Sequence, residues 1–144
     1  MRELVSIMLA GKGFGIPVGE VRDVLAPPPM TPIPLAPAEV AGALNLRGRI
    51  VVAIDLRKRL GLAPAPEGAA QMCVVVEFAG ELYSFLVDRV GDVLRPEDDA
   101  IEHGTSVLDP AWRQIAAGIC RLDHGLLVIL DVGRAVDLGA RAAA

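Results

Sequence analysis

Aromatic residues are scarce in this sequence, at 3% of 144 residues, with one tryptophan, one tyrosine and three phenylalanines. Proteins that bind single-stranded nucleic acid commonly stack the bases on aromatic side chains. The formal net charge is −4, which disfavours a phosphate backbone as partner. The composition therefore predicts that the chain binds no nucleic acid.

Groups that carry chemistry are also few. His103 and His124, the two histidines, have no cysteine, histidine or carboxylate neighbours at metal-ligand spacing, so no zinc site is expected. Both are expected in polar turns. None of the serines shows a nucleophile-elbow pattern, and Cys73 and Cys120 lie in apolar stretches typical of buried thiols. The acidic residues 97–102 fit a solvated loop better than a calcium site. We therefore expect no catalytic residues, no cofactor and no metal.

Long apolar runs are missing as well. No stretch of about 18 apolar residues is present that could span a bilayer as a helix. The first residues do not form a secretory segment, because Arg2 and Glu3 precede only a short apolar run. These features predict a cytoplasmic protein with no direct membrane insertion.

The hydrophobic residues, 53% of the chain, fall in short runs that predict strands. Apolar residues alternate in two segments, around residues 5–9 and 14–18, with Gly11, Gly13 and Gly15 between or within them, which predicts a β-hairpin. Continuous apolar runs at residues 50–54, 72–76, 82–87 and 126–130 predict strands that are covered on both faces.

Helices are expected to be short. Asp55 can cap a helix over residues 56–60 that ends at Gly61, and Asp131 can cap one that runs to Leu138 before Gly139. One or two helical turns are predicted at residues 20–25, ended by the prolines of residues 27–37. Residues 57–59 are expected on a solvated helix face. Residues 63–70 fit a linker between two halves.

An internal repeat organises these elements. Residues 14–25, FGIPVGEVRDVL, match residues 83–94, YSFLVDRVGDVL, with identical residues at five positions. A second match follows in the same order, in which Ala41-Gly42, Leu46 and the strand–Asp–helix corner at Asp55 correspond to residues 117–118, 122 and 131. The repeat predicts two similar β-rich units, approximately residues 1–66 and 67–144, within one domain.

Arg47 is the charged residue whose position is most informative. It lies in a tight turn, NLRG at residues 45–48, that leads into an apolar strand. An arginine at such a turn suits a carboxylate, for which Asp23 is a candidate, or a partner protein. The sequence leaves both readings open.

Residues 42–48, GALNLRG, and residues 50–57, IVVAIDLR, resemble the signature of CheW domains. Residues 21–25, VRDVL, resemble that family's short helix after the second strand, and residues 32–37, PIPLAP, its proline-bounded approach to the signature. Residues 86–94 and 117–131 also fit the family. The resemblance covers about residues 5–138. Two departures stand out: Asp23 replaces a frequent glutamate, and Val52 replaces a frequent proline.

The resemblance implies a mainly β fold of two SH3-like five-stranded β-barrels that share a core, with a few short helices. It implies a non-catalytic adaptor that couples a CheA-type histidine kinase, through its regulatory domain, to the cytoplasmic tip of methyl-accepting chemoreceptors, recruited to membrane-associated arrays. The alternative is a scaffold of the same fold that serves a different signalling partner without receptor coupling. The kinase is expected at an exposed barrel end, with the turn at residues 11–15 as one possibility. The residues expected in a receptor groove between the barrels are Val21, Asp23, Gly42, Asn45, Leu46, Arg47, Val87 and Val90.

Overall fold

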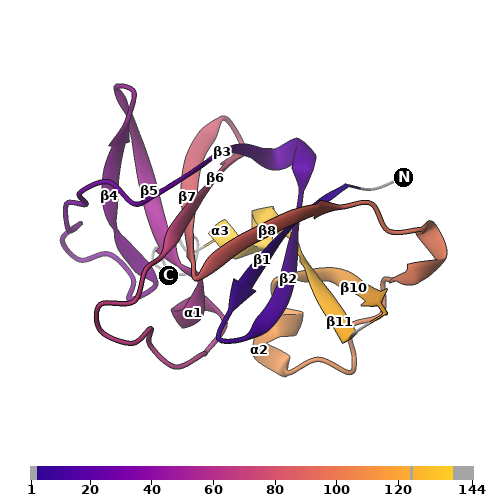
Figure 1. Cartoon of the computed structure of the whole chain (residues 1–144). Coiled ribbons are helices and arrows are strands. Elements are labelled where there is room, and N and C mark those ends of the chain that lie inside the picture. Colours follow the sequence, from indigo (N-terminus) through magenta and orange to yellow (C-terminus); the bar gives the residue numbers. More distant parts are fainter. Residues whose placement is uncertain (1–2, 124, 138–144) are drawn as a thin grey trace.

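The computed structural model describes residues 3–123 and 125–137, and most of its regular structure is β-strand (Figure 1). The strands are β1 (Leu4–Leu9), β2 (Lys12–Pro17), β3 (Val21–Leu25), β4 (Val40–Leu46), β5 (Arg49–Asp55), β6 (Met72–Phe78), β7 (Glu81–Val87), β8 (Arg89–Leu94), β9 (Ile101–Glu102), β10 (Ala116–Leu122) and β11 (Gly125–Leu130). The helices are α1 (Leu56–Arg59), α2 (Pro110–Arg113) and α3 (Val132–Val136), with single 3-10 turns at Val18–Glu20 and Asp98–Ala100. The predicted strands are confirmed, and residues 63–70 contain neither helix nor strand.

Two sheets build the molecule, and each combines strands from both copies of the repeat. One sheet has the order β8-β1-β2-β11-β10-β9 and the other β3-β6-β7-β5-β4. In the repeat, each strand of the first copy has an equivalent in the second: β1 corresponds to β6, β2 to β7, β3 to β8, β4 to β10 and β5 to β11. Equivalent strands take the same places in the two sheets, and only the two-residue strand β9 has no equivalent. We call the first sheet the terminal barrel, because it contains the first strand, β1, and the last strand, β11, and the second sheet the central barrel.

The exchange of strands joins the two copies of the repeat to each other. The central barrel is continuous in sequence from β3 to β7, whereas β1 and β2 join the terminal barrel through the parallel pairing of β2 with β11. In the central barrel, the parallel pairing of β5 with β7 corresponds to the pairing of β2 with β11. The predicted division near residue 66 therefore describes the two copies of the repeat, and the sheets are divided differently.

Three hydrophobic clusters fill the fold. The largest lies between the barrels and includes Phe14, Val74 and Phe85 among nineteen buried residues. The clusters inside the central and terminal barrels contain seven and four buried residues. Cys73 and Cys120 belong to these two inner clusters, which confirms their predicted burial. Because burying a large apolar side chain contributes about 1.5–3 kcal/mol, the shared cluster joins the barrels into one body.

The hairpins are fixed by local turn chemistry. Ala10-Gly11, Arg47-Gly48 and Ala79-Gly80 all have positive φ values, between 52° and 86°, at the two central positions of their turns. This backbone shape is the twisted turn that suits two-residue β-hairpins, and glycine at the second position adopts it without strain. Gly13 and Gly15 lie within β2 instead, where a Cβ on Gly15 would come within 2.8 Å of Leu127.

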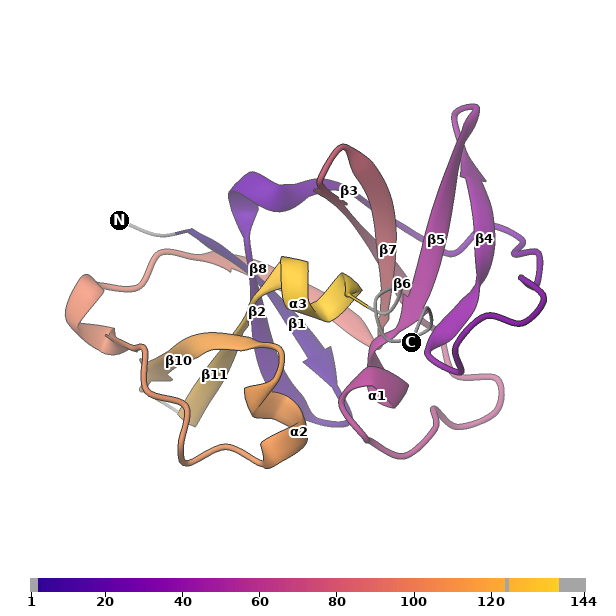
Figure 2. The same cartoon turned by 180° about the vertical axis from the view of Figure 1, so that it is seen from behind.

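Both predicted helix caps are confirmed. The Asp55 carboxylate accepts a hydrogen bond from the Lys58 amide at 3.2 Å, and the Asp131 carboxylate accepts one from the Arg134 amide at 3.1 Å. Gly61, with φ of 72°, follows α1 as expected. The predicted end of the last helix at Leu138–Gly139, and His124, lie outside the described residues. Figure 2 shows the three helices together on one side of the molecule.

The helix predicted at residues 20–25 is wrong. Only a 3-10 turn forms, at Val18–Glu20, and residues 21–25 are strand β3. Val21 and Val24 are β-branched, which favours a strand, and β3 pairs antiparallel with β6 from the second copy. This distant pairing satisfies the backbone polar groups that a helix would otherwise satisfy locally.

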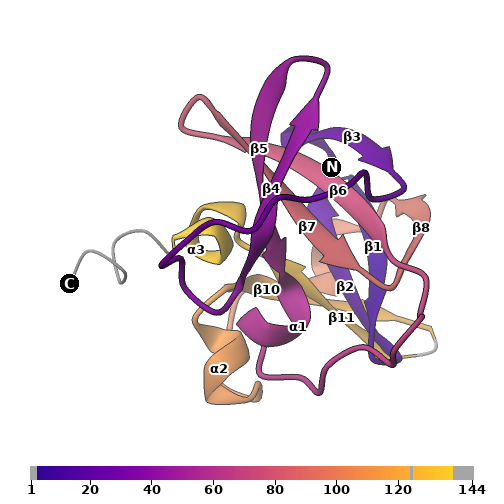
Figure 3. The same ribbon diagram turned by 90° about the vertical axis from the view of Figure 1, so that its left-hand side faces the viewer.

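Two further predictions of burial need correction. Residues 50–54 were expected to be covered on both faces, but the side chain of Ile50 is 68% exposed. It lies at the tip of the β4–β5 hairpin, which projects beyond the rest of its barrel (Figure 3). Leu126, the first residue of the run at 126–130, is similarly 56% exposed near the end of its own hairpin.

The predicted solvated face at residues 57–59 is also wrong, since Arg57 and Arg59 are buried and only Lys58 is exposed. The guanidinium of Arg57 contacts Asp88 with N–O distances of 2.6 and 3.0 Å. Arg59 donates to the carbonyls of Arg134 and Ala135, near the end of α3. Helix α1 is thus covered by distant segments, which satisfy both charged groups.

Candidate functional site

Charged side chains surround a cavity at one end of the central barrel, and we call this surface the charged mouth. Its residues are Arg22, Asp23, Arg47, Arg49 and Glu77, which surround a cavity of about 170 Å³ over an apolar floor of Leu46, Val75 and Leu82. Strand β3 supplies Arg22 and Asp23, and the β4–β5 hairpin supplies Arg47 and Arg49. The antiparallel pairing of β3 with β6 places Glu77 on the same rim.

The turn that carries Arg47 is held by its neighbours. The side-chain oxygen of Asn45 accepts a hydrogen bond from the Gly48 amide at 2.9 Å. This contact stabilises a turn in which Arg47 has φ of 52°, a conformation uncommon for a residue with a side chain. Asn45 therefore acts on the site through the backbone of the turn.

Arg47 makes the predicted contact with Asp23, at 3.1 Å between Nη2 and Oδ2. The side chain of Arg47 is 79% exposed, whereas that of Asp23 is 24% exposed. An exposed ion pair contributes only about 0.2–1 kcal/mol, so this pair adds little to the stability of the fold. It does orient the guanidinium, whose other N–H groups face solvent and can bind a carboxylate.

The other predicted site residues divide into two groups. Val21 and Val90, which the repeat relates to each other, are half-buried and pack against the shared core. Gly42 and Val87 are buried: Val87 belongs to the shared core, and a Cβ on Gly42 would come within 2.8 Å of the Thr31 carbonyl. Asp23, Leu46 and Arg47 are thus the predicted residues that the structure brings together around one cavity.

Sequence reasoning missed the second ion pair of the charged mouth. Arg22 Nε lies 3.3 Å from Glu77 Oε1, and Arg22 also donates to the Gly19 carbonyl at 2.7 Å. The sequence carried no signal for this pair, because Arg22 lies at the irregularity between Val21 and Asp23 where the register of β3 with β6 shifts.

The equivalent end of the terminal barrel is different. The repeat places Gly91 and Met8 where the charged mouth has Arg22 and Glu77. The resulting apolar mouth is a cavity of about 480 Å³ lined by residues that include Met8, Leu94, Leu122, Leu126 and Leu127. Gly11 and Gly13, in the segment expected to meet the kinase, also line it. The two barrel ends therefore offer surfaces of different chemistry on the same framework.

The described titratable groups with shifted pKa values lie in separate places. Within residues 3–123 and 125–137, no three His, Cys, Asp or Glu side chains are placed to hold a metal ion. The pKa of Glu20 is raised, first by burial and then by the nearby Asp131 carboxylate, and the Arg57 guanidinium lowers the pKa of Asp88. These shifts come from packing and pairing in separate places.

No helix of the described residues is long and apolar enough to cross a membrane.

The sequence model of the CheW-like domain family matches residues 3–139 of this chain. The chain belongs to the CheW-like domain family. Among its relatives, the probable chemotaxis protein CheW of Rhizobium etli is 30% identical over 91% of this chain and 84% of that protein. The chemotaxis protein CheW of Thermotoga maritima is 28% identical over 94% and 87%.

The fold agrees with this membership. The scaffolding protein TtCheW from Thermoanaerobacter tengcongensis superimposes with a TM-score of 0.81 at 28% identity, over 90% of this chain and 88% of that one. The predicted architecture of two SH3-like barrels with a few short helices is confirmed. Membership and fold together make this chain a chemotaxis adaptor, which is a scaffolding role in signal transduction.

Proposed function

We propose that the chain couples a CheA-type histidine kinase to methyl-accepting chemoreceptors, as a cytoplasmic adaptor recruited to receptor arrays. The observation that carries the receptor part of the proposal is the exposed guanidinium of Arg47, which Asp23 orients at the rim of the charged mouth. A receptor tip is a helical hairpin, and an oriented arginine suits a carboxylate on such a helix.

The receptor surface is proposed to extend from the charged mouth to Val21 and Val90, as the family resemblance implies. Strands β3 and β8, which carry these valines, are edge strands of their sheets. Each also presents a more exposed valine, Val24 at 38% and Val93 at 47%. Apolar contacts from these strands and a charged contact from Arg47 together suit an amphipathic helix.

The kinase is proposed to contact the apolar mouth of the terminal barrel. This surface combines an exposed Leu126 with glycines that leave the backbone accessible. A mostly apolar centre is typical of a protein–protein contact, and Asp92 is the one charged residue that lines this cavity, so the kinase surface differs from the charged mouth. The role requires binding alone and no catalytic step.

Titration of the purified chain tests the proposal with two ligands, a CheA-type regulatory domain and a receptor cytoplasmic fragment. Arg47→Ala is expected to weaken receptor binding by tenfold or more and to leave kinase binding unchanged. Arg95→Ala is the matched control, because Arg95 is also exposed and paired with a carboxylate, that of Glu3, and neither residue lines the charged mouth. Leu126→Ser is expected to weaken kinase binding alone.

The alternative is a scaffold without receptor coupling. Saturable kinase binding with no receptor binding by the unmodified chain would establish that alternative. Binding of neither ligand would refute the coupling role while leaving the family and fold unchanged.

A further inference from the structure

The internal repeat extends into the proline-rich segment between β3 and β4. The turn at residues 33–36 corresponds to the turn at residues 109–112, with Pro34 equivalent to Pro110. The Ala36 amide donates to the Ile33 carbonyl at 3.4 Å, and the Trp112 amide donates to the Asp109 carbonyl at 2.9 Å. The next contacts also match, since the amides of Asp55 and Asp131 donate to the carbonyls of Glu39 and Ile115, both at 2.8 Å.

Trp112 fills a defined place in the second copy. Its ring lies edge-on to Phe14, with centroids 5.3 Å apart. Its indole Nε1 donates a hydrogen bond to the Leu60 carbonyl, at the end of α1, at 3.0 Å. This tryptophan therefore covers the side of the terminal barrel and joins it to a helix of the other copy.

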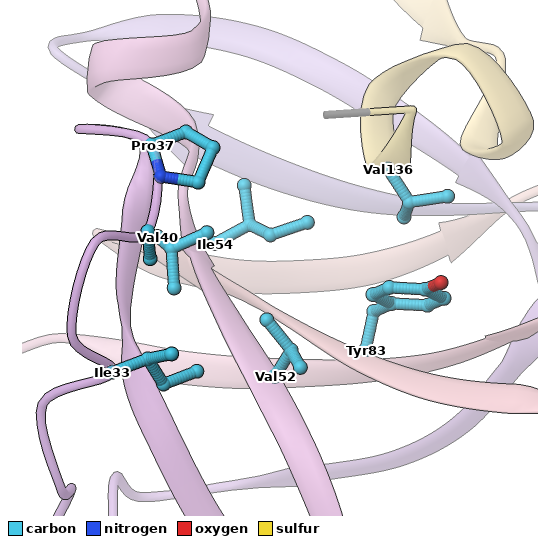
Figure 4. Close-up of a pocket in the computed structure, with 8 residues that line it drawn as sticks. Ile33, Pro37, Val40, Val52, Ile54, Tyr83 and Val136 are labelled. Carbon is cyan, nitrogen blue, oxygen red and sulfur yellow. The ribbon is translucent and has the colours of Figure 1, made fainter. Parts of the chain in front are cut away.

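The position equivalent to Trp112 in the first copy holds a much smaller side chain. The repeat puts Ala36 where Trp112 stands, Tyr83 where Phe14 stands, and Val136 where Leu60 stands. A cavity of about 250 Å³ occupies this place. Its walls come from the proline-rich segment, β4, β5, β7 and α3, as Figure 4 shows, and the lining residues are Ile33, Ala36, Pro37, Val40, Val52, Ile54, Tyr83 and Val136.

The size and lining of the cavity indicate what it can hold. Small-molecule sites usually measure about 300–1,000 Å³ and carry several convergent polar groups. This cavity is smaller, and Tyr83 is its one lining residue with a polar side chain. Both features fit a single large apolar side chain better than a cofactor.

The rim of the cavity is unusual for a surface with no partner. Leu35, in the same turn, is fully exposed and has φ of 62°, a conformation that strains a residue with a side chain. Strained residues of this kind cluster where a surface has a binding role. Beyond Tyr83 and Val136, a second hollow lined by Phe78, Asp131 and Asp137 continues the surface with polar groups. An apolar centre with a polar margin is the usual anatomy of a protein interface.

We infer that this cavity, the Tyr83 pocket, accepts a tryptophan side chain presented on a short turn of a partner protein. The ring would lie against Tyr83 as Trp112 lies against Phe14. Aromatic residues seated in such pockets are frequent anchors of protein interfaces. The Tyr83 pocket shares no lining residue with the charged mouth, so this contact is additional to the proposed receptor site. The last residues of the chain, LGARAAA at 138–144, contain no aromatic residue and cannot supply the ring.

The experiment uses the full chain and a probe copied from its own second repeat. The probe is the capped peptide SVLDPAWRQI, residues 106–115, and the control peptide has leucine in place of tryptophan. Methyl NMR of the full chain is expected to show saturable shifts at Val40, Val52, Ile54 and Val136 with the tryptophan peptide. The control peptide is expected to bind at least tenfold more weakly.

Two variants make the test specific. Ala36→Trp supplies the ring from within the chain and is expected to abolish the peptide-induced shifts, whereas Ala38→Trp, at an exposed neighbouring position, is expected to leave them unchanged. Equal binding of both peptides, or no shift at these methyls, would overturn the inference, and neither result depends on a variant that folds. Shifts that appear only after removal of residues 138–144 would also overturn it, because the tail would then be the occupant.

Discussion

The ion pair between Arg57 and Asp88 is expected to be the most valuable charged contact for the stability of this fold. Its two N–O distances, 2.6 and 3.0 Å, describe a two-point contact, and the two side chains are 10% and 22% exposed. Asp88 also accepts a hydrogen bond from the Ala10 amide at 2.9 Å. Asp88 thereby links α1 to the β1–β2 turn, across the boundary between the barrels.

The magnitude follows from this partial burial. Breaking a fully buried pair costs about 3–5 kcal/mol, and breaking an exposed pair about 0.2–1 kcal/mol. Because Asp88 keeps some access to water, a coupling energy of roughly 2 kcal/mol is expected from a double-mutant cycle with Arg57→Met and Asp88→Asn. Loss of about 2 kcal/mol lowers the melting temperature of a domain of this size by roughly 4–8 °C.

The assay is urea unfolding of the four proteins in the cycle, with a second cycle on the exposed pair Arg95–Glu3 as control. That control pair has an N–O distance of 2.7 Å but side chains that are 63% and 43% exposed, so its coupling energy is expected below about 1 kcal/mol. Equal coupling energies in the two cycles would refute the reasoning, because burial would then not strengthen the pair.

The pH dependence of the same cycle has a definite sign. The Arg57 guanidinium, more than any other group, lowers the pKa of Asp88 in the folded state. A carboxylate with a lowered folded pKa contributes stability above its unfolded pKa of about 3.9 and loses it as pH falls through the folded value. The stability gap between the unmodified chain and Asp88→Asn is therefore expected to be constant above about pH 5 and to shrink in more acidic solution.

Three further predictions concern single residues. Leu35→Gly is expected to raise the free energy of unfolding by about 0.5–1 kcal/mol, because φ is 62° there, while Ala38→Gly, whose φ is not positive, gives no gain by urea unfolding. Gly118→Ala is expected to cost about 1–3 kcal/mol, since its Cβ would lie 2.7 Å from the backbone carbonyl oxygen of Glu102, whereas Gly19→Ala meets nothing within 4 Å; equal losses in thermal unfolding would contradict this packing. Burial raises the pKa of the Cys73 and Cys120 thiols, so mass spectrometry is expected to find neither alkylated by iodoacetamide at pH 8 until the chain unfolds.

Local features of the fold were predictable from the sequence. The hairpin at Gly11 and the helix caps at Asp55 and Asp131 depend on one residue and its near neighbours, which is why sequence reasoning identified them. The turn of Arg47 indicated two possible partners, Asp23 or another protein, and the distance of 3.1 Å shows that Arg47 pairs with Asp23. Its contact with a receptor stays a prediction.

Only the tertiary structure decided which segments meet. Residues 21–25 form a strand because β6, from the other copy, pairs with them, and Arg57 is buried because Asp88 and the Ala63 carbonyl cover it. The same holds for the Tyr83 pocket, which exists because Ala36 stands where the second copy has Trp112. Periodicity and capping report a segment's own preference, whereas pairing and burial depend on residues far away in the chain. The sequence by itself therefore determined most strands, turns and helix caps of each repeat copy. The exchange of strands between the two copies determined which side chains are buried and which form the surface sites.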